Sequence, residues 1–447
     1  LITIEVNSSR GCMFYLVGLP DSAVKESHQR IISALQVNGY RMPTSNIVIN
    51  MAPADIRKEG AAYDLPLAIG ILAASEVIQS DKLERYLLMG ELSLDGSLQP
   101  IKGALPIAIK ARELGFEGMI VPQQNAHEAA VVNNLKVYGA GNIKEVIEFF
   151  NGTQELTPTL VNTREEFYSQ QSNFDFDFAE VKGQENVKRA LEVAASGSHN
   201  ILLIGSPGSG KSMLAKRLPS ILPPLSLGES LETTKIHSVA GKLGKDGGLI
   251  SKRPFRAPHH TISTVAMTGG GSFPQPGEIS LAHNGILYLD ELPEYSRNVL
   301  EVLRQPLEDR KITVSRIRCN VEYPASFMLV ASMNPCPCGY YTHPTKACVC
   351  SPGQVQKYLN RISGPLLDRI DLQIEITPLS FDELSRQAPG ESSATIRERV
   401  VRARRIQEQR YAEQEGVHCN AQMTSKLLRE YASLDDVGTE MLRAAMS

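Results

Sequence analysis

The sequence predicts an α/β protein in which an α+β domain precedes a second domain with a parallel sheet and a smaller helical appendage. Apolar segments of strand length alternate with segments of helical periodicity, which favours parallel strands joined by helices. A glycine-rich turn joins the strand expected over residues 200–204 to a following helix. A polar, turn-rich stretch over residues 151–177 separates the two patterned regions and indicates a linker.

The first domain contains strand-like and helix-like segments in mixed order. Its clearest helix is expected over residues 21–38, where Val24, Ile31, Ile32 and Leu35 fall on one face. Strands are expected over residues 1–6, 46–50 and 118–121, and further helices over residues 65–75 and 104–114.

The second domain begins near residue 178 with a helix expected over residues 184–195. Its strands are expected over residues 200–204, 286–289, 327–331 and 371–376. From about residue 379 the pattern is helical, with helices expected over residues 394–411 and 425–431.

The composition excludes several classes of protein. Of the 447 residues, 42% are hydrophobic and 21% are charged, so wholesale disorder is excluded. No run of 18 apolar residues occurs, which argues against a membrane-spanning protein. The net charge of -3 excludes a globally basic nucleic-acid coat protein but is compatible with a local basic surface. We expect a cytoplasmic protein, because no charged-then-apolar segment opens the sequence and the cysteines are unevenly spaced.

Residues 205–212 match the phosphate-binding pattern G-x-x-x-x-G-K-[ST] in full, as Gly205, Ser206, Pro207, Gly208, Ser209, Gly210, Lys211 and Ser212. The glycines let backbone amides turn toward phosphates, and the following helix N-terminus favours anions. We expect Lys211 to reach the β- and γ-phosphates of ATP and the Ser212 hydroxyl to bind Mg²⁺. A chance glycine turn is the alternative, and the flanking strand and helix argue against it.

The apolar strand over residues 286–289 ends in two carboxylates. In P-loop enzymes an acidic residue at such a strand end holds Mg²⁺, which is the role that we assign to Asp290. Glu291 is then the base that orients and polarises the attacking water. The alternative is a solvated strand end before the turn at Leu292 and Pro293.

Four of the seven cysteines fall within fifteen residues, as Cys336, Cys338, Cys348 and Cys350. A disulfide scaffold would spread them more evenly. Two pairs of thiolates from two turns can complete a tetrahedral shell, so we predict a Zn²⁺ site. The C-x-C spacing is less usual than C-x₂-C, and free or redox-linked thiols are the alternative; His343 is an alternative ligand.

These motifs resemble those of AAA+ ATPases, and longer segments resemble the magnesium-chelatase-related ComM/YifB family. The segments are Arg-Ala-Pro-His-His at residues 256–260, Gly-Glu-Ile-Ser-Leu-Ala-His-Asn-Gly at 277–285 and Ser-Gly-Pro-Leu-Leu-Asp-Arg at 363–369. The resemblance covers nearly the whole chain. It implies a non-proteolytic Lon-protease/S5-like domain over residues 1–155, a linker over 156–177, an ATPase core over 178–380 and a helical lid over 381–447 that we expect to be incomplete.

The resemblance also implies roles for individual residues. Val181 and Gly183 match a segment that packs against adenine, and Asn334 matches a polar sensor near the γ-phosphate. Arg369 matches an arginine that acts on ATP in the neighbouring subunit of a homo-oligomeric ring, usually of six. The alternative for Arg369 is an ion pair with Asp368 or Asp371.

Two insertions typical of the resembling families are expected over residues 254–280 and 308–324. In related helicases such hairpins line the pore of the ring, so Arg310, Lys311 and Arg316 are candidates to grip a nucleic-acid backbone. An ordinary solvated hairpin is the alternative. The six arginines of the helix at residues 394–411 favour a solvated face over contact with DNA or a neighbouring subunit.

In the Lon-like domain, proteolysis would require a serine activated by a lysine. The matching positions hold Ala62 and Leu105, and Lys102 is displaced from the lysine position. We therefore expect no peptidase activity and interpret this domain as serving ring assembly or nucleic-acid contact.

The resemblance implies an ATP- and Mg²⁺-dependent ring motor that acts on single-stranded or branched DNA in recombination or natural transformation. One alternative is a magnesium-chelatase-type ATPase subunit that drives metal insertion into a tetrapyrrole. The other is an assembly or chaperone module, against which the intact set of Lys211, Asp290 and Glu291 argues.

Overall fold

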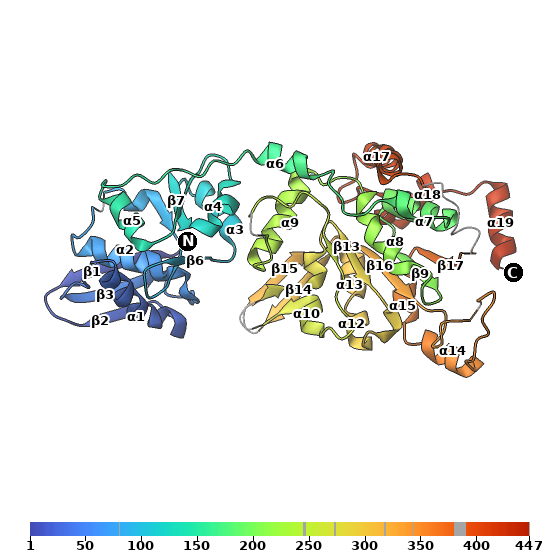
Figure 1. Ribbon diagram of the computed structural model, residues 1–447, viewed down its shortest axis with the longest axis horizontal. Helices are drawn as coiled ribbons and strands as arrows, with labels where there is room; N and C mark the ends of the chain where they lie inside the picture. The colour runs from blue at the N-terminus through green and yellow to red at the C-terminus, as the bar shows by residue number, and fades with distance from the viewer. Residues whose placement is uncertain are drawn as a thin grey trace. The chain divides into compact units, whose positions relative to one another are not determined.

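The computed structural model describes residues 1–79, 81–244, 247–271, 274–316, 319–341, 343–379 and 390–446 (Figure 1). The chain forms two compact units. The first consists of Leu1–Gln170 and Ser230–Ser251, and the second of Gln171–Glu229 and Lys252–Ser447. Helix α9 (Leu227–Val239) therefore begins in the second unit and ends in the first.

The first sheet of the first unit has the strand order β1 (Thr3–Ser9), β3 (Asn46–Ala52), β2 (Phe14–Val17). Strand β3 is antiparallel to β1 and parallel to β2. Alternate residues of β3 are buried against α1 (Ser22–Val37) and α2 (Asp64–Ala74), which is the pattern of a sheet with one covered face. The predicted helix over residues 21–38 is confirmed, and its N-terminus is capped by Asp21, which accepts a hydrogen bond from the Val24 amide at 2.8 Å.

The second sheet of this unit is parallel and has the order β4 (Tyr86–Leu88), β7 (Gly118–Pro122), β8 (Lys136–Ala140). Strand β7 is buried throughout because its side chains alternate between two apolar clusters. The remaining elements of the unit are α3 (Ala104–Glu113), α4 (Gln123–Ala130), α5 (Ile143–Phe150) and the hairpin of β5 (Glu91–Leu92) with β6 (Leu98–Gln99). The predicted α+β character is confirmed.

A buried ion pair joins the two long helices of the first unit. The Asp64 carboxylate accepts hydrogen bonds from Arg30 Nε at 2.6 Å and Arg30 Nη2 at 2.9 Å, and from the Leu92 amide at 3.1 Å. Burial raises the pKa of Asp64, while the bonds from Arg30 and Leu92 oppose that shift. Together the three bonds fix α1 against α2 and against strand β5, to which Leu92 belongs.

Glu128 in α4 attaches the segment Ser230–Ser251 to the first unit. Its Oε1 accepts hydrogen bonds from the Leu105 amide at 2.9 Å and from Ser238 Oγ at 2.5 Å. The Gly103 amide donates to the Ser238 carbonyl at 3.1 Å. This attachment could not be predicted from the sequence, because it joins positions more than a hundred residues apart through one carboxylate.

The segment predicted as a linker, residues 156–177, contains helix α6 (Thr163–Gln170), whose Phe167 is buried. One aromatic residue in a polar stretch gave no helical periodicity, so this helix was missed. The domain boundaries drawn from the sequence stay predictions.

The positions matched to a protease dyad lie in the first unit and carry alkyl side chains. Ala62 lies in a 3₁₀ turn (Ala61–Tyr63), and Leu105 is buried in α3. Neither side chain can act as a nucleophile or a base. Lack of peptidase activity therefore remains our expectation.

The second unit is built on a parallel sheet with the strand order β10 (Phe255–Arg256), β13 (Ile286–Leu289), β16 (Met328–Met333), β9 (Ile201–Gly205), β17 (Leu372–Ile376). Strands β13 and β16 are buried throughout, as expected for a sheet covered on both faces. The predicted α/β class and its four strands are confirmed. Strand β10 was missed because two residues leave no periodic pattern.

Helices cover the two faces of this sheet (Figure 1). Helices α7 (Glu185–Gly197) and α8 (Lys211–Arg217) pack on one face with α17 (Ser393–Arg410). The other face is covered by α12 (Arg297–Glu301), α13 (Arg304–Asp309), α14 (Pro352–Leu359) and α15 (Gly364–Leu367). The insertion at residues 254–280 contains α10 (Thr264–Thr268), α11 (Glu278–Leu281) and the strand pair of β11 (Gly269–Gly270) and β12 (Gln275–Pro276). The insertion at residues 308–324 contains the strand pair of β14 (Lys311–Arg316) and β15 (Cys319–Pro324). The last two helices of the chain are α18 (Ser425–Tyr431) and α19 (Asp436–Met446).

The arginines of α17 partly serve the packing of that helix on α7. Arg399 Nε donates to Glu192 Oε1 at 2.7 Å, and Arg404 Nε donates to the Ser196 carbonyl at 3.0 Å. The expectation of a solvated arginine face is therefore wrong for these two residues. Ile406 of α17 is 57% exposed, while Gln407 is buried.

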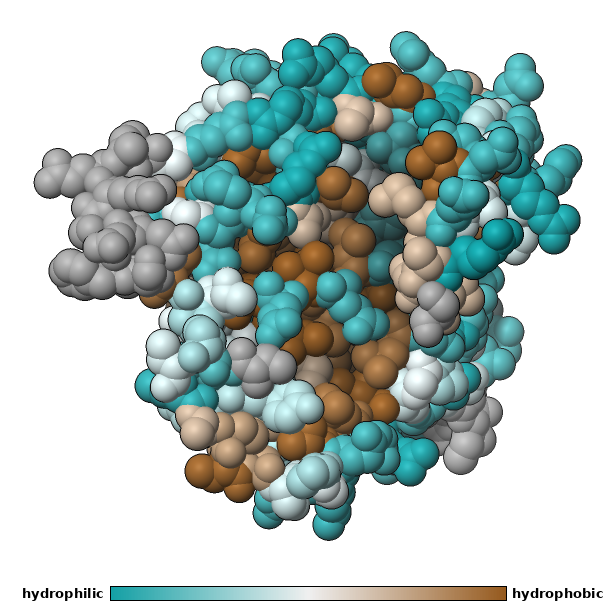
Figure 2. Space-filling model, turned by 90° about the vertical axis from the view of Figure 1, so that its right-hand side faces the viewer, coloured by the Kyte–Doolittle hydropathy of each residue, from teal (hydrophilic) through white to brown (hydrophobic). Residues whose placement is uncertain are grey.

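Helix α19 presents apolar side chains to solvent: Val437, Met441 and Met446 are exposed, and no residue of this helix is buried. Figure 2 shows hydrophobic residues gathered in a hollow of the face that it presents, within a largely hydrophilic rim. Within the described ranges, no helix is long and apolar enough to cross a membrane.

Candidate functional site

The phosphate-binding motif lies at the carboxyl end of β9, the strand between β16 and β17. Gly205 ends β9, and a Cβ atom there would lie 2.6 Å from Ser209 Oγ and 2.9 Å from the Ile376 carbonyl oxygen. Gly208 and Gly210 have φ values of 80° and 92°, which favour glycine. Helix α8 begins at Lys211, so its N-terminus faces the loop. This is the local geometry of an anion site.

Lys211 joins the loop to the neighbouring strand. Its Nζ donates to the carbonyl oxygens of Gly205 at 2.7 Å and Ser206 at 2.9 Å, and to Asn334 Oδ1 at 3.1 Å. Burial lowers the pKa of Lys211, while the charges of Asp290 and Glu291 oppose that shift. A phosphate could replace these acceptors. The structure thus brings the predicted Lys211 and Asn334 together.

Asp290 follows β13 and is held by hydroxyl groups. Ser212 Oγ donates to Asp290 Oδ2 at 2.9 Å, and Ser332 Oγ donates to Asp290 Oδ1. Burial opposes ionisation, but these bonds lower the pKa of Asp290 on balance. Hydroxyl and carboxylate oxygens are the ligands that Mg²⁺ prefers, so Ser212 and Asp290 fit the ion. Ser332 was not predicted, because a serine inside a buried strand gives no signal in the sequence.

Glu291 lies next to Asp290 in a left-handed backbone conformation with φ of 55°, and its side chain is 57% exposed. Its carboxylate is 3.6 Å from His260 Nδ1. His260 comes from the Arg-Ala-Pro-His-His segment, whose Pro258 carbonyl accepts a hydrogen bond from Tyr295. Sequence reasoning did not identify this contact between His260 and the expected base.

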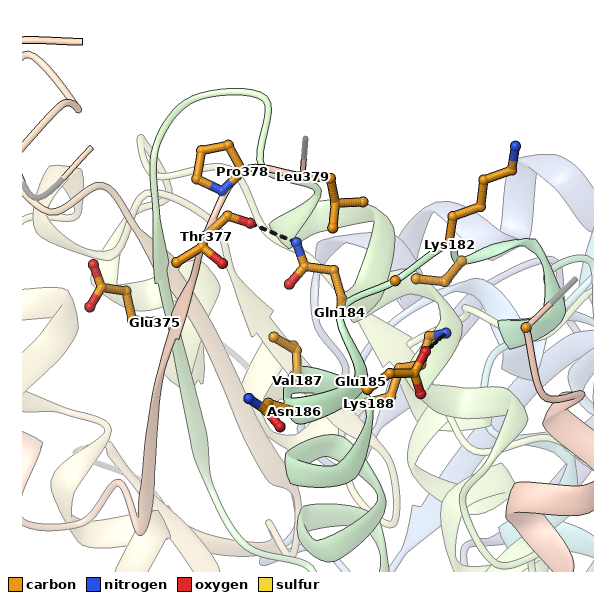
Figure 3. A pocket seen from close by; sticks show the side chains of 13 residues that line it. Lys182, Gln184, Glu185, Asn186, Val187, Lys188, Glu375, Thr377, Pro378 and Leu379 are labelled. Atoms are coloured by element: carbon orange, nitrogen blue, oxygen red, sulfur yellow. Dashed lines mark hydrogen bonds and ion pairs between the residues drawn. The ribbon is translucent and has the colours of Figure 1, made fainter. Parts of the chain in front are cut away.

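A cavity of about 590 Å³ lies beside the end of β17 (Figure 3). It is lined by Val181, Gly183 and Gln184 before α7 and by Thr377 after β17. Gln184 Nε2 donates to the Thr377 carbonyl at 2.7 Å, and Figure 3 shows the two residues facing each other. Ile376, which precedes Thr377, pairs with Gly205 in the sheet, whereas the residues that line the cavity come from the segments before α7 and after β17. Its volume is in the range of small-molecule sites, and the adenine role of Val181 and Gly183 stays a prediction.

Arg369 follows α15 and pairs with Glu308 in α13. It also donates to the Pro365 carbonyl, and its Nε has no hydrogen-bond partner among the described residues. Asp371 contacts His199 instead, at 2.9 Å from His199 Nδ1. The sequence left an ion pair of Arg369 with Asp368 or Asp371 as the alternative. Arg369 does form an ion pair, but its partner is Glu308.

The predicted hairpin consists of β14 and β15, with Lys311 opposite Pro324 and Arg316 opposite Cys319. The turn residues 317–318 and the Arg316 side chain lie outside the described part of the structure. Lys311 Nζ pairs with Glu322 Oε2 at 3.0 Å. Tyr323 OH donates to the Pro274 carbonyl at 2.8 Å, so this hairpin contacts the insertion at residues 254–280.

Arg310 is not placed for contact with a nucleic acid. It ends α13 with φ of 56°, and its Nη1 donates to the Phe327 carbonyl at 3.1 Å. Burial lowers its pKa. The expectation that Arg310 grips DNA is corrected: the guanidinium holds the base of the hairpin to the start of β16.

The four clustered cysteines come together after β16, with their Sγ atoms all within 4.8 Å of one another. The measured separations are 3.3 Å for Cys336–Cys338, 3.7 Å for Cys336–Cys348 and 3.5 Å for Cys338–Cys348. Tetrahedral Zn²⁺ with Zn–S bonds of about 2.3 Å requires S···S distances of about 3.8 Å, whereas a disulfide requires about 2 Å. The Tyr341 amide donates a hydrogen bond to Cys336 Sγ at 3.3 Å. The four thiols therefore fit the predicted Zn²⁺.

We expect about one Zn²⁺ per chain in protein purified without added metal. Cys348→Ser should lower both the zinc content, measured by mass spectrometry, and the melting temperature, because the shell loses one thiolate. Cys12→Ser is the matched control, since Cys12 is exposed and outside the cluster. Wild-type protein without zinc, or a Cys348→Ser protein with unchanged zinc, would contradict the assignment.

Comparison with known proteins agrees with this geometry. The family model for magnesium chelatase, subunit ChlI, matches residues 177–384. The model for subunit ChlI of Mg-chelatase matches residues 4–125, and the model for the ChlI C-terminal region matches residues 390–447. Competence protein ComM of Haemophilus influenzae is 42% identical over 450 residues, covering 100% of this chain and 86% of the relative. YifB of Escherichia coli is 44% identical over 441 residues, covering 97% and 83%.

The magnesium-chelatase 38 kDa subunit of Rhodobacter capsulatus is more distant, with 26% identity over 179 residues that cover 36% of this chain and 50% of the subunit. The long matches to ComM and YifB and the three family models together decide the assignment. The chain belongs to the magnesium-chelatase-related AAA+ ATPases, in the family of ComM and YifB.

Proposed function

We propose that this protein is an ATP-driven ring motor that translocates on single-stranded or branched DNA and promotes branch migration. The observation that carries the proposal is the joined pair of insertions, in which the β14–β15 hairpin contacts the insertion at residues 254–280 through Tyr323 and Pro274. The hairpin has Lys311 on one arm and Arg316 beside its turn. The name competence protein, borne by a relative with 42% identity, supports a substrate met in natural transformation.

Each residue at the carboxyl end of the sheet has a separate role in ATP hydrolysis. The phosphate loop and Lys211 hold the phosphates, and Ser212 and Asp290 hold Mg²⁺, which would offset charge on the β- and γ-phosphates. Glu291 accepts the proton of the attacking water. Asn334, 3.1 Å from Lys211 Nζ, orients that water or the γ-phosphate.

The alternative function is that of a magnesium-chelatase-type ATPase subunit, and the 26% identity to the 38 kDa subunit supports it. Its ATPase activity would not respond to DNA. The response of hydrolysis to nucleic acid therefore separates the two functions.

ATP hydrolysis should rise on addition of single-stranded or branched DNA, and Arg316→Ala should reduce this stimulation while leaving basal hydrolysis unchanged. Removal of one phosphate contact should also lower the salt slope of DNA affinity by roughly 0.7–0.9. Arg405→Ala, at an exposed position of α17, is the matched control. Hydrolysis that is indifferent to every DNA form would favour the chelatase-type function.

Glu291→Gln should still bind ATP and hydrolyse it roughly 10²-fold more slowly, because the amide keeps the shape but cannot accept the proton. The measurements are nucleotide affinity and steady-state turnover. His260→Ala is a useful comparison, since it removes the side chain 3.6 Å from Glu291 and leaves the carboxylate. Near-normal turnover in Glu291→Gln would remove Glu291 from the mechanism.

Arg369 should act on ATP held by the adjacent subunit, where an arginine supplied in trans contributes roughly 10³–10⁵ in rate in other P-loop systems. Arg369→Ala should bind ATP and hydrolyse it poorly, and mixing with Lys211→Ala subunits should restore part of the activity. Mixed interfaces would pair an intact arginine with an intact phosphate loop.

The Glu308 partner provides the control for this experiment. Glu308→Ala removes the ion pair, leaves the hydrogen bond from Arg369 to the Pro365 carbonyl in place, and should retain hydrolysis if Arg369 acts in trans. If Glu308→Ala is as impaired as Arg369→Ala, and mixed rings form without rescue, Arg369 serves only the ion pair within its own subunit.

A further inference from the structure

The cysteine loop is built into the segment that carries the expected γ-phosphate sensor. The chain leaves β16 at Met333, passes Asn334 and reaches Cys336, which is fully buried. After Cys350 it enters α14 through Ser351, whose side chain and that of Gln354 form a capping box. The four thiols thus close a loop between a central strand and a capped helix.

Gly339 of this loop lies directly against the phosphate loop. It has φ of +84°, and a Cβ atom at this position would lie 2.5 Å from Pro207 Cδ and 2.8 Å from Pro207 Cγ. The Gly339 amide donates to the Cys336 carbonyl at 3.0 Å, so Gly339 is fixed within the turn that presents Cys336 and Cys338. Only glycine allows the cysteine turn to approach Pro207 this closely.

Asn334 lies between the phosphate loop and helix α14. Its side chain accepts a hydrogen bond from Lys211 Nζ at 3.1 Å. Burial raises the pKa of the Tyr358 phenol in α14, and the nearby backbone of Asn334 opposes that rise. Placement of α14 in turn depends on where the cysteine loop ends. The phosphate loop, the sensor and the cysteine loop are therefore in continuous contact.

We propose that the four-cysteine loop is a metal-dependent brace for the phosphate loop, so that an ion bound by the four thiolates sets the affinity of the site for nucleotide. A bound ion would fix the turn that holds Gly339 against Pro207 and thereby keep Asn334 beside Lys211. Without the ion, Cys348 is joined to Cys336 and Cys338 by thiol contacts of 3.7 Å and 3.5 Å, which hold the loop less firmly than bonds to a metal would. This inference rests on the proposed ATP-binding function and assigns a positioning role to Gly339.

The test measures binding of a fluorescent ATP analogue in Mg²⁺, together with zinc content. Gly339→Ala should retain zinc and bind the analogue about tenfold or more weakly, because the added methyl overlaps Pro207. Gly416→Ala is the matched control: its φ of +76° imposes a similar backbone strain, but nothing lies within 4 Å of its Cβ position. It should bind as the wild type does.

Two further measurements separate the brace from a general loss of structure. Pro207→Ala in the Gly339→Ala protein removes the overlapping atoms and should recover part of the affinity. Removal of zinc from the wild type by a chelator should weaken binding to a similar degree, and zinc should restore it, with the circular dichroism spectrum unchanged throughout.

The outcomes distinguish this inference from the proposed function. If zinc-loaded wild type does not bind the analogue, the ATPase assignment fails. If it binds, and both zinc removal and Gly339→Ala leave the affinity unchanged, the brace is overturned while the ATPase assignment stands. A loss in Gly339→Ala that is matched by Gly416→Ala also overturns it, because backbone strain alone would then explain the effect.

Discussion

The half-buried ammonium of Lys211 is the constraint on which the rest of the second unit depends. Its three acceptors come from the end of β9 and from Asn334 after β16, so one charge ties two adjacent strands together. A charge in this position requires partners with good geometry, and the carboxylates after β13 supply the opposing field. Because β13, β16 and β9 are neighbours in a parallel sheet, the functional residues that follow them lie together at the carboxyl edge of the sheet. These residues are Asp290, Asn334 and Lys211.

The same edge depends on close backbone approach as much as on charge. Gly205 lets Ser209 of the phosphate loop and the Ile376 carbonyl of β17 approach the end of β9, and Gly339 lets the cysteine turn come near Pro207. In both places a Cβ atom would lie within 3 Å of a neighbour, which a packed interior cannot accommodate without displacement. The glycines of this unit are thus contact positions between segments as well as sites of positive φ.

Several arginines that a charge pattern would assign to partners are used inside the chain. Arg399 pairs with Glu192, Arg369 with Glu308, and Arg310 with the Phe327 carbonyl. Arginine suits this use because its planar fork can make several hydrogen bonds at once. The number of basic residues in a sequence therefore overestimates the positive charge that is available on the surface for binding DNA. In the hairpin of β14 and β15, Lys311 and Arg316 remain the candidate DNA contacts.

The sequence by itself determined the fold class, the four longer strands of the second unit and the motifs of the nucleotide and metal sites, because these depend on local periodicity and on residues close together in the chain. Tertiary structure alone decided the partner of Arg369, the burial of Gln407 in α17, the hydroxyl of Ser332 on Asp290 and the attachment of Ser230–Ser251 through Glu128. Each of these is a contact between distant residues whose formation depends on burial and hydrogen-bond geometry, and no local pattern records which of several available partners wins.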